Sequence, residues 1–228
     1  MNPLLRNSES HVFVPSLPAV SLSHEDEHHL DSVLRLDATD IITVSDGAGG
    51  WATANWSRLR GLTIISEIHH EPPHEPLTIG CAIPKGDRPE MIVQKLTELG
   101  IDRILLFETA RSIVRWDADK RRRQLERLRR IALEAAMQSR RVYLPAVDCV
   151  AFDQIIQFNG VAMAEPAGRD VLDETITTVL IGPEGGFDRD ELDYAVPKIE
   201  LSQLVLRVET AAIVAASLLV TARASNTR

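Results

Sequence analysis

The feature that most constrains the fold is a short apolar run that ends in a glycine-rich turn. Val179, Leu180 and Ile181 have the pattern of a strand, and the sequence Gly-Pro-Glu-Gly-Gly follows at residues 182–186. Asp188, with Glu191 three residues later, is typical of a capping box at a helix start. The turn would lie at the carboxyl end of the strand, where open α/β sheets bind ligands. The stretch therefore predicts an α/β sheet with a binding loop at residues 182–186.

The sequence before and after this loop continues the alternation of strands and helices. Residues 77–83 predict a buried strand, followed by a helix that Asp87 caps and Gly100 ends, and then by a strand at residues 104–107. Such a β-α-β unit implies a parallel sheet. The remaining elements predicted are helices at residues 119–138 and 209–222 and strands at residues 161–164 and 204–208.

The first part of the chain has a different pattern. It predicts strands at residues 11–14, 41–44 and 51–56, with one helix at residues 24–36, which favours a small β-barrel. Three prolines within residues 71–76 then predict a linker, because proline continues neither a strand ladder nor a helix. We expect two domains, residues 1–72 and 73–228.

Composition narrows the classes of protein. No apolar run is long enough to span a bilayer, and the first residues lack the pattern of a secretory signal, so we expect a cytoplasmic protein with no membrane partner. Cys81 and Cys149 are predicted to be buried, reduced thiols. All seven histidines lie between His11 and His74 without a convincing set of ligands, so no metal site is predicted.

The distribution of charge points to a polyanion. The net charge is -8, but residues 111–141 hold 11 basic and 4 acidic residues, a local balance of +7 that leaves -15 for the rest. A concentrated basic segment on an acidic protein steers nucleic acid to one face. The alternative is a solvated helix face.

The loop at residues 182–186 does not have the composition of a phosphate site. It lacks the Lys-Ser/Thr ending of a P-loop and the G-x-G-x-x-G pattern, and Glu184 at its centre would repel polyphosphate. It favours a ligand with hydroxyls, amines or a positive centre, such as a nucleoside that carries a sulfonium. The alternative is a tight turn without a ligand.

Several short motifs follow one another along the chain. They are residues 29–30 (HL), 33–36 (VLRL), 44–47 (VSDG), 83–87 (IPKGD), 93–100 (VQKLTELG), 111–112 (RS), 115–116 (RW), 134–136 (EAA), 138–139 (QS), 181–187 (IGPEGGF), 206–207 (LR) and 209–211 (ETA). In this order the motifs resemble those of a known family, the ribosomal RNA small subunit methyltransferase E family of the SPOUT superfamily, and the resemblance runs over almost the whole chain.

The resemblance implies a fold and a cofactor. It implies a PUA-like, RNA-binding β-barrel, a SPOUT domain with a carboxyl-terminal trefoil knot, a homodimer, and methylation of N3 of a uridine in 16S rRNA of the small ribosomal subunit. It also implies S-adenosylmethionine (SAM) as cofactor. By position, the SAM-binding residues are Met163, Ala164, Glu165, Leu180, Gly182, Pro183, Glu184, Gly185, Gly186, Leu201, Ser202, Leu204, Leu206, Thr210, Ala211 and Ala212.

For catalysis we expect Arg207 to stabilise the uracil anion that forms when N3 loses its proton. Glu209 is expected to orient Arg207 or to accept the proton, and Glu184 is a lesser candidate for either role. The structural alternative is an ion pair between Arg207 and Glu209 at the start of the last helix.

For RNA binding we expect basic side chains from both halves of the chain. They are Arg35, Lys85, Arg111, Arg115, Arg122, Arg129, Arg140 and Arg141.

The chain also departs from the family pattern beside the cofactor segment. Residues 201–204 read Leu-Ser-Gln-Leu where Leu-Gly-Pro-Arg is common, Val208 replaces a threonine, and Ser10 or His11 replaces an arginine. These departures favour one alternative function, an RNA-binding ribosome assembly factor that has lost methyl transfer. A second alternative is another nucleotide-binding enzyme whose glycine-rich loop binds phosphate.

Overall fold

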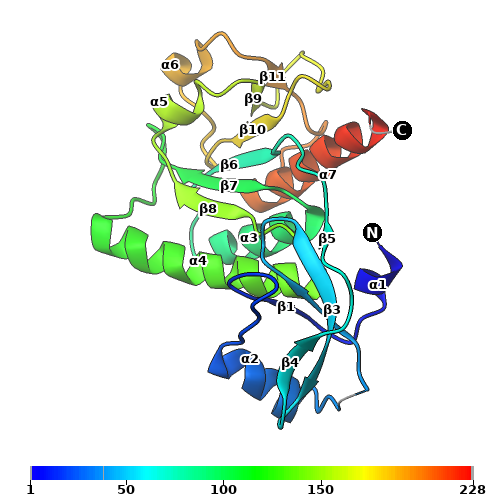
Figure 1. The fold of residues 1–228 in the computed structure, drawn as a ribbon. Helices are drawn as coiled ribbons and strands as arrows, with labels where there is room; N and C mark the ends of the chain where they lie inside the picture. The colour runs from blue at the N-terminus through cyan, green and yellow to red at the C-terminus, as the bar shows by residue number, and fades with distance from the viewer. Residues whose placement is uncertain (1, 38, 227–228) are drawn as a thin grey trace. The chain divides into compact units, whose positions relative to one another are not determined.

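The computed structural model describes residues 2–37 and 39–226, which form two compact units (Figure 1). The first unit comprises the residues up to His74 together with Leu133–Leu144. The second comprises Glu75–Ala132 and the residues from Pro145 onward.

The first unit is built on a mixed five-stranded sheet. The strands are β1 (His11–Phe13), β2 (Ile42–Ser45), β3 (Gly50–Ser57), β4 (Gly61–Ile64) and β5 (His69–His70), and the helical segments are α1 (Pro3–Arg6), α2 (His24–His28) and the π-helical turn η1 (His29–Val33). The order is β1-β2-β3-β4, with β5 beside β3. Strand β1 is parallel to β2, and the other pairs are antiparallel. The predicted strands at residues 11–14, 41–44 and 51–56 are confirmed.

The helix expected at residues 24–36 is shorter than predicted. It ends at Val33, and Arg35 has a φ of 54°, a left-handed conformation that an α-helix does not continue. Leu30 is fully buried among the strands, so packing of this one side chain accounts for the apolar signal in the segment.

The end of a long helix and the loop after it complete the first unit. His11 Nε2 donates a hydrogen bond to the Arg141 carbonyl, and His11 Nδ1 forms a hydrogen bond with Thr43 Oγ1, each at 2.8 Å. Ser45 Oγ donates to the Val142 carbonyl at 3.0 Å, and Tyr143 Oη donates to the Glu71 carbonyl at 2.8 Å. These bonds hold residues 141–143 against the sheet.

The second unit is an α/β structure around a six-stranded parallel sheet, as predicted. Its strands are β6 (Thr78–Ala82), β7 (Arg103–Phe107), β8 (Ala146–Cys149), β9 (Val161–Ala164), β10 (Thr178–Ile181) and β11 (Lys198–Ile199), in the order β11-β9-β10-β6-β7-β8. Every pair of neighbours is parallel. The helices are α3 (Arg88–Leu99), α4 (Ala118–Gln138), whose last turns belong to the first unit, α5 (Phe152–Ile155), α6 (Arg189–Leu192) and α7 (Val208–Asn226).

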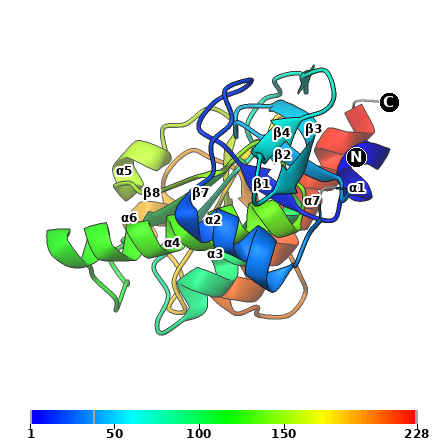
Figure 2. The ribbon, with the colours of Figure 1, turned by 60° about the horizontal axis from the view of Figure 1, so that its bottom comes forward.

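Side chains alternate between the two faces of this sheet, and each face has its own core. Val179 and Ile181 pack in the larger core with α3, α4 and α7, whereas Met163 and Leu180 pack in the smaller one with α5. This is the period of two that a β-strand imposes. Helices α3 and α7 contact each other on the first face (Figure 2).

Two predicted details of helix α3 have different outcomes. Gly100 ends the helix with a φ of 95°, as expected for a left-handed carboxyl-terminal cap. The Asp87 side chain makes no capping hydrogen bond, so that prediction is wrong; its carbonyl instead accepts from the N–H of Glu90 at 3.1 Å.

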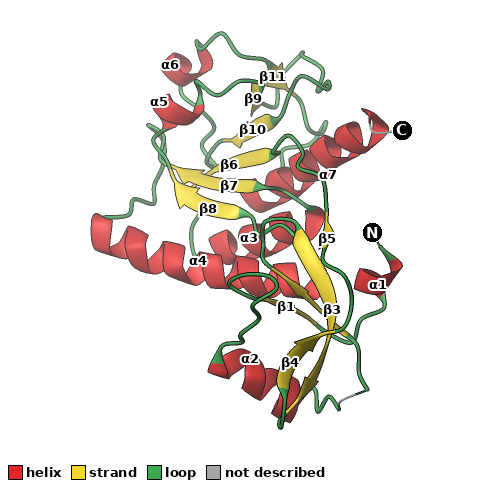
Figure 3. Ribbon diagram, viewed as in Figure 1, coloured by secondary structure: helices red, strands yellow, loops and turns green. Residues whose placement is uncertain are grey.

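The strand predicted at residues 204–208 is also wrong. The last strand is β11, which pairs with Met163 and Ala164 of β9, and residues 200–207 form a loop before α7 (Figure 3). The side chains of Leu204 and Val205 are 77% and 86% exposed. Their apolar character therefore reflects something other than burial in a sheet.

Candidate functional site

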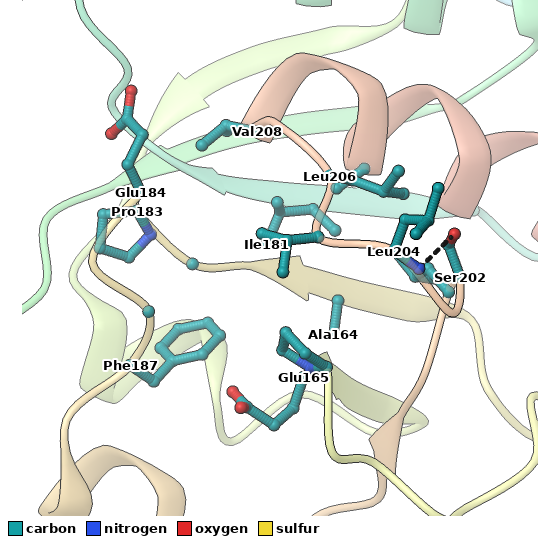
Figure 4. A pocket seen from close by; sticks show the side chains of 16 residues that line it. Ala164, Glu165, Ile181, Pro183, Glu184, Phe187, Ser202, Leu204, Leu206 and Val208 are labelled. Atoms are coloured by element: carbon teal, nitrogen blue, oxygen red, sulfur yellow. Dashed lines mark hydrogen bonds between the residues drawn. The ribbon is translucent and has the colours of Figure 1, made fainter.

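A pocket lies where strands β9 and β10 end, between the loop at residues 182–187 and the segment that leads into α7 (Figure 4). This is the carboxyl edge of a parallel sheet, the usual place for a ligand in α/β folds. Its lining residues are Ala164, Glu165, Pro166, Ile181, Gly182, Pro183, Glu184, Gly186, Phe187, Leu201, Ser202, Leu204, Val205, Leu206, Val208 and Ala211.

The glycine-rich loop is fixed from both ends. Asp188 Oδ1 accepts from the Glu191 N–H at 2.8 Å and Glu191 Oε2 accepts from the Asp188 N–H at 2.9 Å, so the predicted capping box is confirmed. Gly186 has a φ of 70°, which favours glycine. A Cβ on Gly182 would lie 3.0 Å from the Phe187 ring, so this glycine allows the ring to pack beneath the loop.

Arg111 holds the same loop from outside the pocket. Its Nη1 donates to the carbonyls of Gly185 and Phe187 at 3.0 and 3.1 Å. Glu191 Oε1 also accepts from the N–H of Ala110 at 2.8 Å, which ties the segment after β7 to the start of α6. Arg111, predicted to bind RNA, thus has a structural role in the loop.

The chemistry of the pocket is apolar with an acidic component. Among the described residues that line it, two are acidic, Glu165 and Glu184, and none is lysine, arginine or histidine. Helix α6, which follows the loop, has only four residues, so its dipole is small. The lining is therefore poorly suited to a polyphosphate and well suited to a neutral or cationic ligand that has an apolar surface.

Most of the predicted SAM-binding residues line this one pocket. Those that do are Ala164, Glu165, Gly182, Pro183, Glu184, Gly186, Leu201, Ser202, Leu204, Leu206 and Ala211. Met163 and Leu180 are fully buried in the core on the opposite face of the sheet, and Gly185, Thr210 and Ala212 are also outside the lining. A side-chain contact between the ligand and Met163 or Leu180 would require the ligand to cross the sheet.

The three predicted catalytic residues are placed at the edge of the pocket. Arg207 is exposed between two lining residues, Leu206 and Val208, and its guanidinium has no hydrogen bond or ion pair within the described part of the chain. Glu209 is buried in the first turn of α7 and pairs not with Arg207 but with Arg88, whose Nε lies 3.9 Å from its Oε2. The ion pair considered between Arg207 and Glu209 is absent from these described side chains.

Glu184 is also engaged by Arg88. Arg88 Nη1 donates to Glu184 Oε1 at 2.5 Å, and the Glu184 carboxylate points away from Ala164 and Ile181 (Figure 4). Glu184 therefore lines the pocket, as predicted, with its carboxylate directed toward Arg88. Glu165 is the lining carboxylate for which the described residues provide no hydrogen-bond donor or cation.

The predicted RNA-binding side chains are distributed over both units. Arg35, Arg140 and Arg141 lie in the first unit; the Arg140 guanidinium donates to the carbonyls of Met137 and Ser8 at 3.1 and 2.9 Å. In the second unit Lys85 is exposed, whereas Arg115 pairs with Glu108, Arg122 with Glu126, and Arg129 with the Val147 carbonyl and Asp148. These pairs are at the surface, where ion pairs are weak and exchange readily with phosphate.

Sequence reasoning missed several residues of the site. Ile181, Phe187 and Val208 line the pocket. Ile181 could have been predicted, because side chains alternate along a strand and Ile181 therefore lies on the opposite face of the sheet from Leu180. Arg88 had no such signal, because nothing in the sequence indicates that residues 88, 184 and 209 meet.

The described residues contain no group of three or more His, Cys, Asp or Glu side chains that could hold a metal ion. In the same part of the chain, no helix has both the length and the apolar character needed to cross a membrane.

Comparison with known proteins places the chain among RNA methyltransferases. Residues 70–220 match the family model described as RNA methyltransferase domain. Ribosomal RNA small subunit methyltransferase E of Mycobacterium tuberculosis is 31% identical over 227 residues, covering 89% of this chain and 86% of that protein. The protein of the same name from Bacillus subtilis is 29% identical over 237 residues, covering 90% of each chain.

Solved structures are similar over nearly the whole length. A methyltransferase from Legionella pneumophila, in complex with bound SAM, is 27% identical with a TM-score of 0.79, covering 93% of this chain and 97% of that one. Ribosomal RNA small subunit methyltransferase E from Neisseria gonorrhoeae, bound to SAM, is 24% identical with a TM-score of 0.80 and the same coverage, which indicates a shared fold.

Proposed function

The chain belongs to the family of ribosomal RNA small subunit methyltransferase E, and on that premise we propose that it transfers the methyl group of SAM to N3 of a uridine in 16S rRNA. The observation that carries the proposal is the pocket at the ends of β9 and β10. Among the described residues its lining is apolar, with no basic side chain and with the carboxylate of Glu165, which suits a nucleoside with a positive sulfur centre. The rival function, a phosphate bound in this loop, finds no lysine, arginine or histidine among the described lining residues, and Arg88 and Arg111 beside the loop are already engaged by Glu184 and by loop carbonyls.

The chain's own residues supply binding and charge stabilisation. When bound, SAM supplies the electrophilic methyl group. Ala164, Ile181 and Leu206 would contact its apolar parts, and Glu165 would accept hydrogen bonds from its polar hydroxyl or amino groups. Such positioning brings the uridine N3 into line for transfer, which is a large part of the acceleration.

We assign to Arg207 the role of acting on the base. Loss of the N3 proton would leave negative charge on the ring and its two carbonyl oxygens, and N3 would then bond to the methyl carbon as the bond between that carbon and the sulfur of SAM breaks. The guanidinium of Arg207, exposed beside the pocket with no partner among the described residues, is available to donate to such an oxygen. Glu209 would accept the proton only after release from Arg88, so it is the less direct candidate.

Finer features of the architecture are part of the proposal. We assign residues 1–72 to a PUA-like, RNA-binding barrel and residues 73–228 to a SPOUT domain with a trefoil knot near its carboxyl end. The homodimer rests on the family alone, because the small residues Ala211, Ala212 and Ala215 of α7 are buried in the chain's own core. The protein would act in the cytoplasm on rRNA or on the small ribosomal subunit.

A methyl-transfer assay tests the proposed function. Small-subunit particles from a strain that lacks the gene are incubated with the protein and SAM, and their nucleosides are analysed by mass. We expect one 3-methyluridine per particle. Binding of particles without methyl transfer would favour the assembly-factor alternative, which the altered segment at residues 201–204 supports.

Substitution of Arg207 tests its role in catalysis. Arg207→Ala should lower kcat by about 10²- to 10³-fold, the usual effect of removing one donor to a developing oxyanion. The affinity for SAM, measured by calorimetry, should stay within about twofold because the side chain lies outside the pocket lining. Near-normal turnover by Arg207→Ala would exclude the role, and exposed Arg103→Ala at the far end of β7 serves as the control.

A further inference from the structure

Arg88 joins two carboxylates that come from separate walls of the pocket. Its Nη1 donates to Glu184 Oε1 at 2.5 Å, and its Nε lies 3.9 Å from Glu209 Oε2. Glu184 belongs to the glycine-rich loop, and Glu209 to the first turn of α7. Arg88 itself is the first residue of α3, a helix that packs against α7.

The contact with Glu209 is incomplete. Glu209 is buried, and its Oε2 is one of the few buried side-chain oxygens that lack a hydrogen-bond partner in the described part of the chain. A buried carboxylate is costly unless a cation or a donor compensates its charge. Arg88 is the cation within 4 Å of Glu209 Oε2, so its charge compensates the burial of this carboxylate.

We propose that Arg88 is a positioning residue that fixes the glycine-rich loop to the first turn of α7 and thereby holds the two walls of the cofactor pocket at the correct separation. The proposal rests on the proposed function for the identity of the ligand. Arg88 is not a lining residue, so it acts through Glu184 and Glu209 rather than on the ligand. The role of Glu184 follows from the same geometry, as a partner of Arg88 and not as a ligand of SAM.

Hydrogen exchange of the cofactor-free protein tests the positioning directly. In Arg88→Ala, the amides of residues 183–187 and 208–211 should exchange at least about tenfold faster, as expected when a charge-assisted hydrogen bond is lost. Amides of β6 and β7 should exchange as in the wild type, which shows that the fold persists. Unchanged exchange in the loop would overturn the proposal, and this readout does not depend on any cofactor.

Cofactor affinity tests the consequence. Calorimetry with SAM should show a dissociation constant roughly tenfold higher for Arg88→Ala, and the KM for SAM should rise while kcat at saturating SAM changes by less than about threefold. Arg88→Lys should recover part of the affinity, because it keeps the charge but cannot reach both carboxylates. The control is Lys95→Ala, which removes a surface ion pair with Glu98 on the same helix and should bind SAM normally.

A double-mutant cycle separates the two roles of Glu184. If Glu184 acts through Arg88, Glu184→Gln weakens SAM binding in the wild type but adds little to Arg88→Ala. Additive effects would show that Glu184 contacts SAM itself and would overturn that part of the proposal. If the wild type fails to bind SAM while loop exchange still responds to Arg88→Ala, the proposed function fails and the positioning role stands.

Discussion

At the scale of single residues, the buried ring of His11 makes the stability of the first unit depend on pH. The ring is buried between Thr43 and the Arg141 carbonyl. Burial lowers the pKa of His11 to about 4. The hydrogen bond with the Arg141 carbonyl raises this pKa, and the guanidinium of Arg140 lowers it further. From the family resemblance we expect Ser10 or His11 to occupy a position where an arginine is common. The buried imidazole thus occupies a position that a permanent cation would not tolerate without other partners.

This predicts a loss of stability in acid. Because the folded pKa is below the unfolded value, the contribution of His11 is complete above pH 6.5 and is lost as the pH falls toward 4. The loss should be about 3 kcal/mol, measured as the free energy of unfolding by urea at pH 7.5 and pH 4.

The matched variants isolate this one group. His11→Asn should remove the His11 share of the pH dependence, whereas the exposed His70→Asn should keep it. An equal loss of stability in acid for the wild type and His11→Asn would contradict the assignment.

At the scale of elements, the loop between β11 and α7 carries the sequence Leu-Ser-Gln-Leu at residues 201–204, where the family resemblance leads us to expect Leu-Gly-Pro-Arg. Leu204 lines the pocket although its side chain is 77% exposed, and the N–H of Leu204 donates to Ser202 Oγ at 3.1 Å. The N–H of Gln203 donates to no group in the described part of the chain, so proline at this position would remove no hydrogen bond. The loop therefore has room for the more rigid family sequence.

Replacing residues 202–204 with Gly-Pro-Arg should tighten SAM binding. Proline lowers the conformational entropy that binding must remove, and we expect a dissociation constant about threefold lower by calorimetry. Gln203→Ala is the control, because it shortens the side chain without restricting the backbone. Weaker binding by the triple variant would show that Leu204 contributes an apolar contact that the family sequence lacks.

At the scale of the whole molecule, charge is concentrated on α4. Its apolar side chains Leu125, Leu128 and Ala132 are buried, and the arginines on its other faces are exposed. Arg121 and Arg130 have no ion pair or hydrogen bond from their side chains within the described residues. Like the exposed Arg123, they are available to phosphate.

RNA affinity should depend steeply on salt. The double variant Arg121→Ala/Arg130→Ala should reduce the slope of log K against log salt by roughly 1.4 to 1.8, because each lost phosphate contact contributes about 0.7 to 0.9. The slope is measured by filter binding of a 16S rRNA fragment at KCl concentrations from about 50 to about 300 mM, a range that includes physiological salt. Arg103→Ala is the control outside the basic segment, and a slope unchanged by the double variant would place the RNA elsewhere.

Features of the fold could be predicted from the sequence where they depend on residues that are close together in the chain. The capping box at Asp188 and the helix end at Gly100 were predicted because each depends on contacts within a few residues. The strand at residues 204–208 was predicted wrongly, because apolar residues beside a pocket have the same pattern as a buried strand. Pairing with β9 decides that the strand is Lys198–Ile199 instead.

The sequence by itself determined the parallel α/β unit, the glycine-rich loop at the end of β10 and, through its motifs, the family. These depend on periodicity and on turn chemistry, which are written in neighbouring residues. Only the tertiary structure decided that Glu184 and Glu209 pair with Arg88 and that Arg207 is exposed beside the pocket. An ion pair between residues 96 or more positions apart has no local signal, because it is fixed by the packing of α3 against α7 and by the strand that carries the loop.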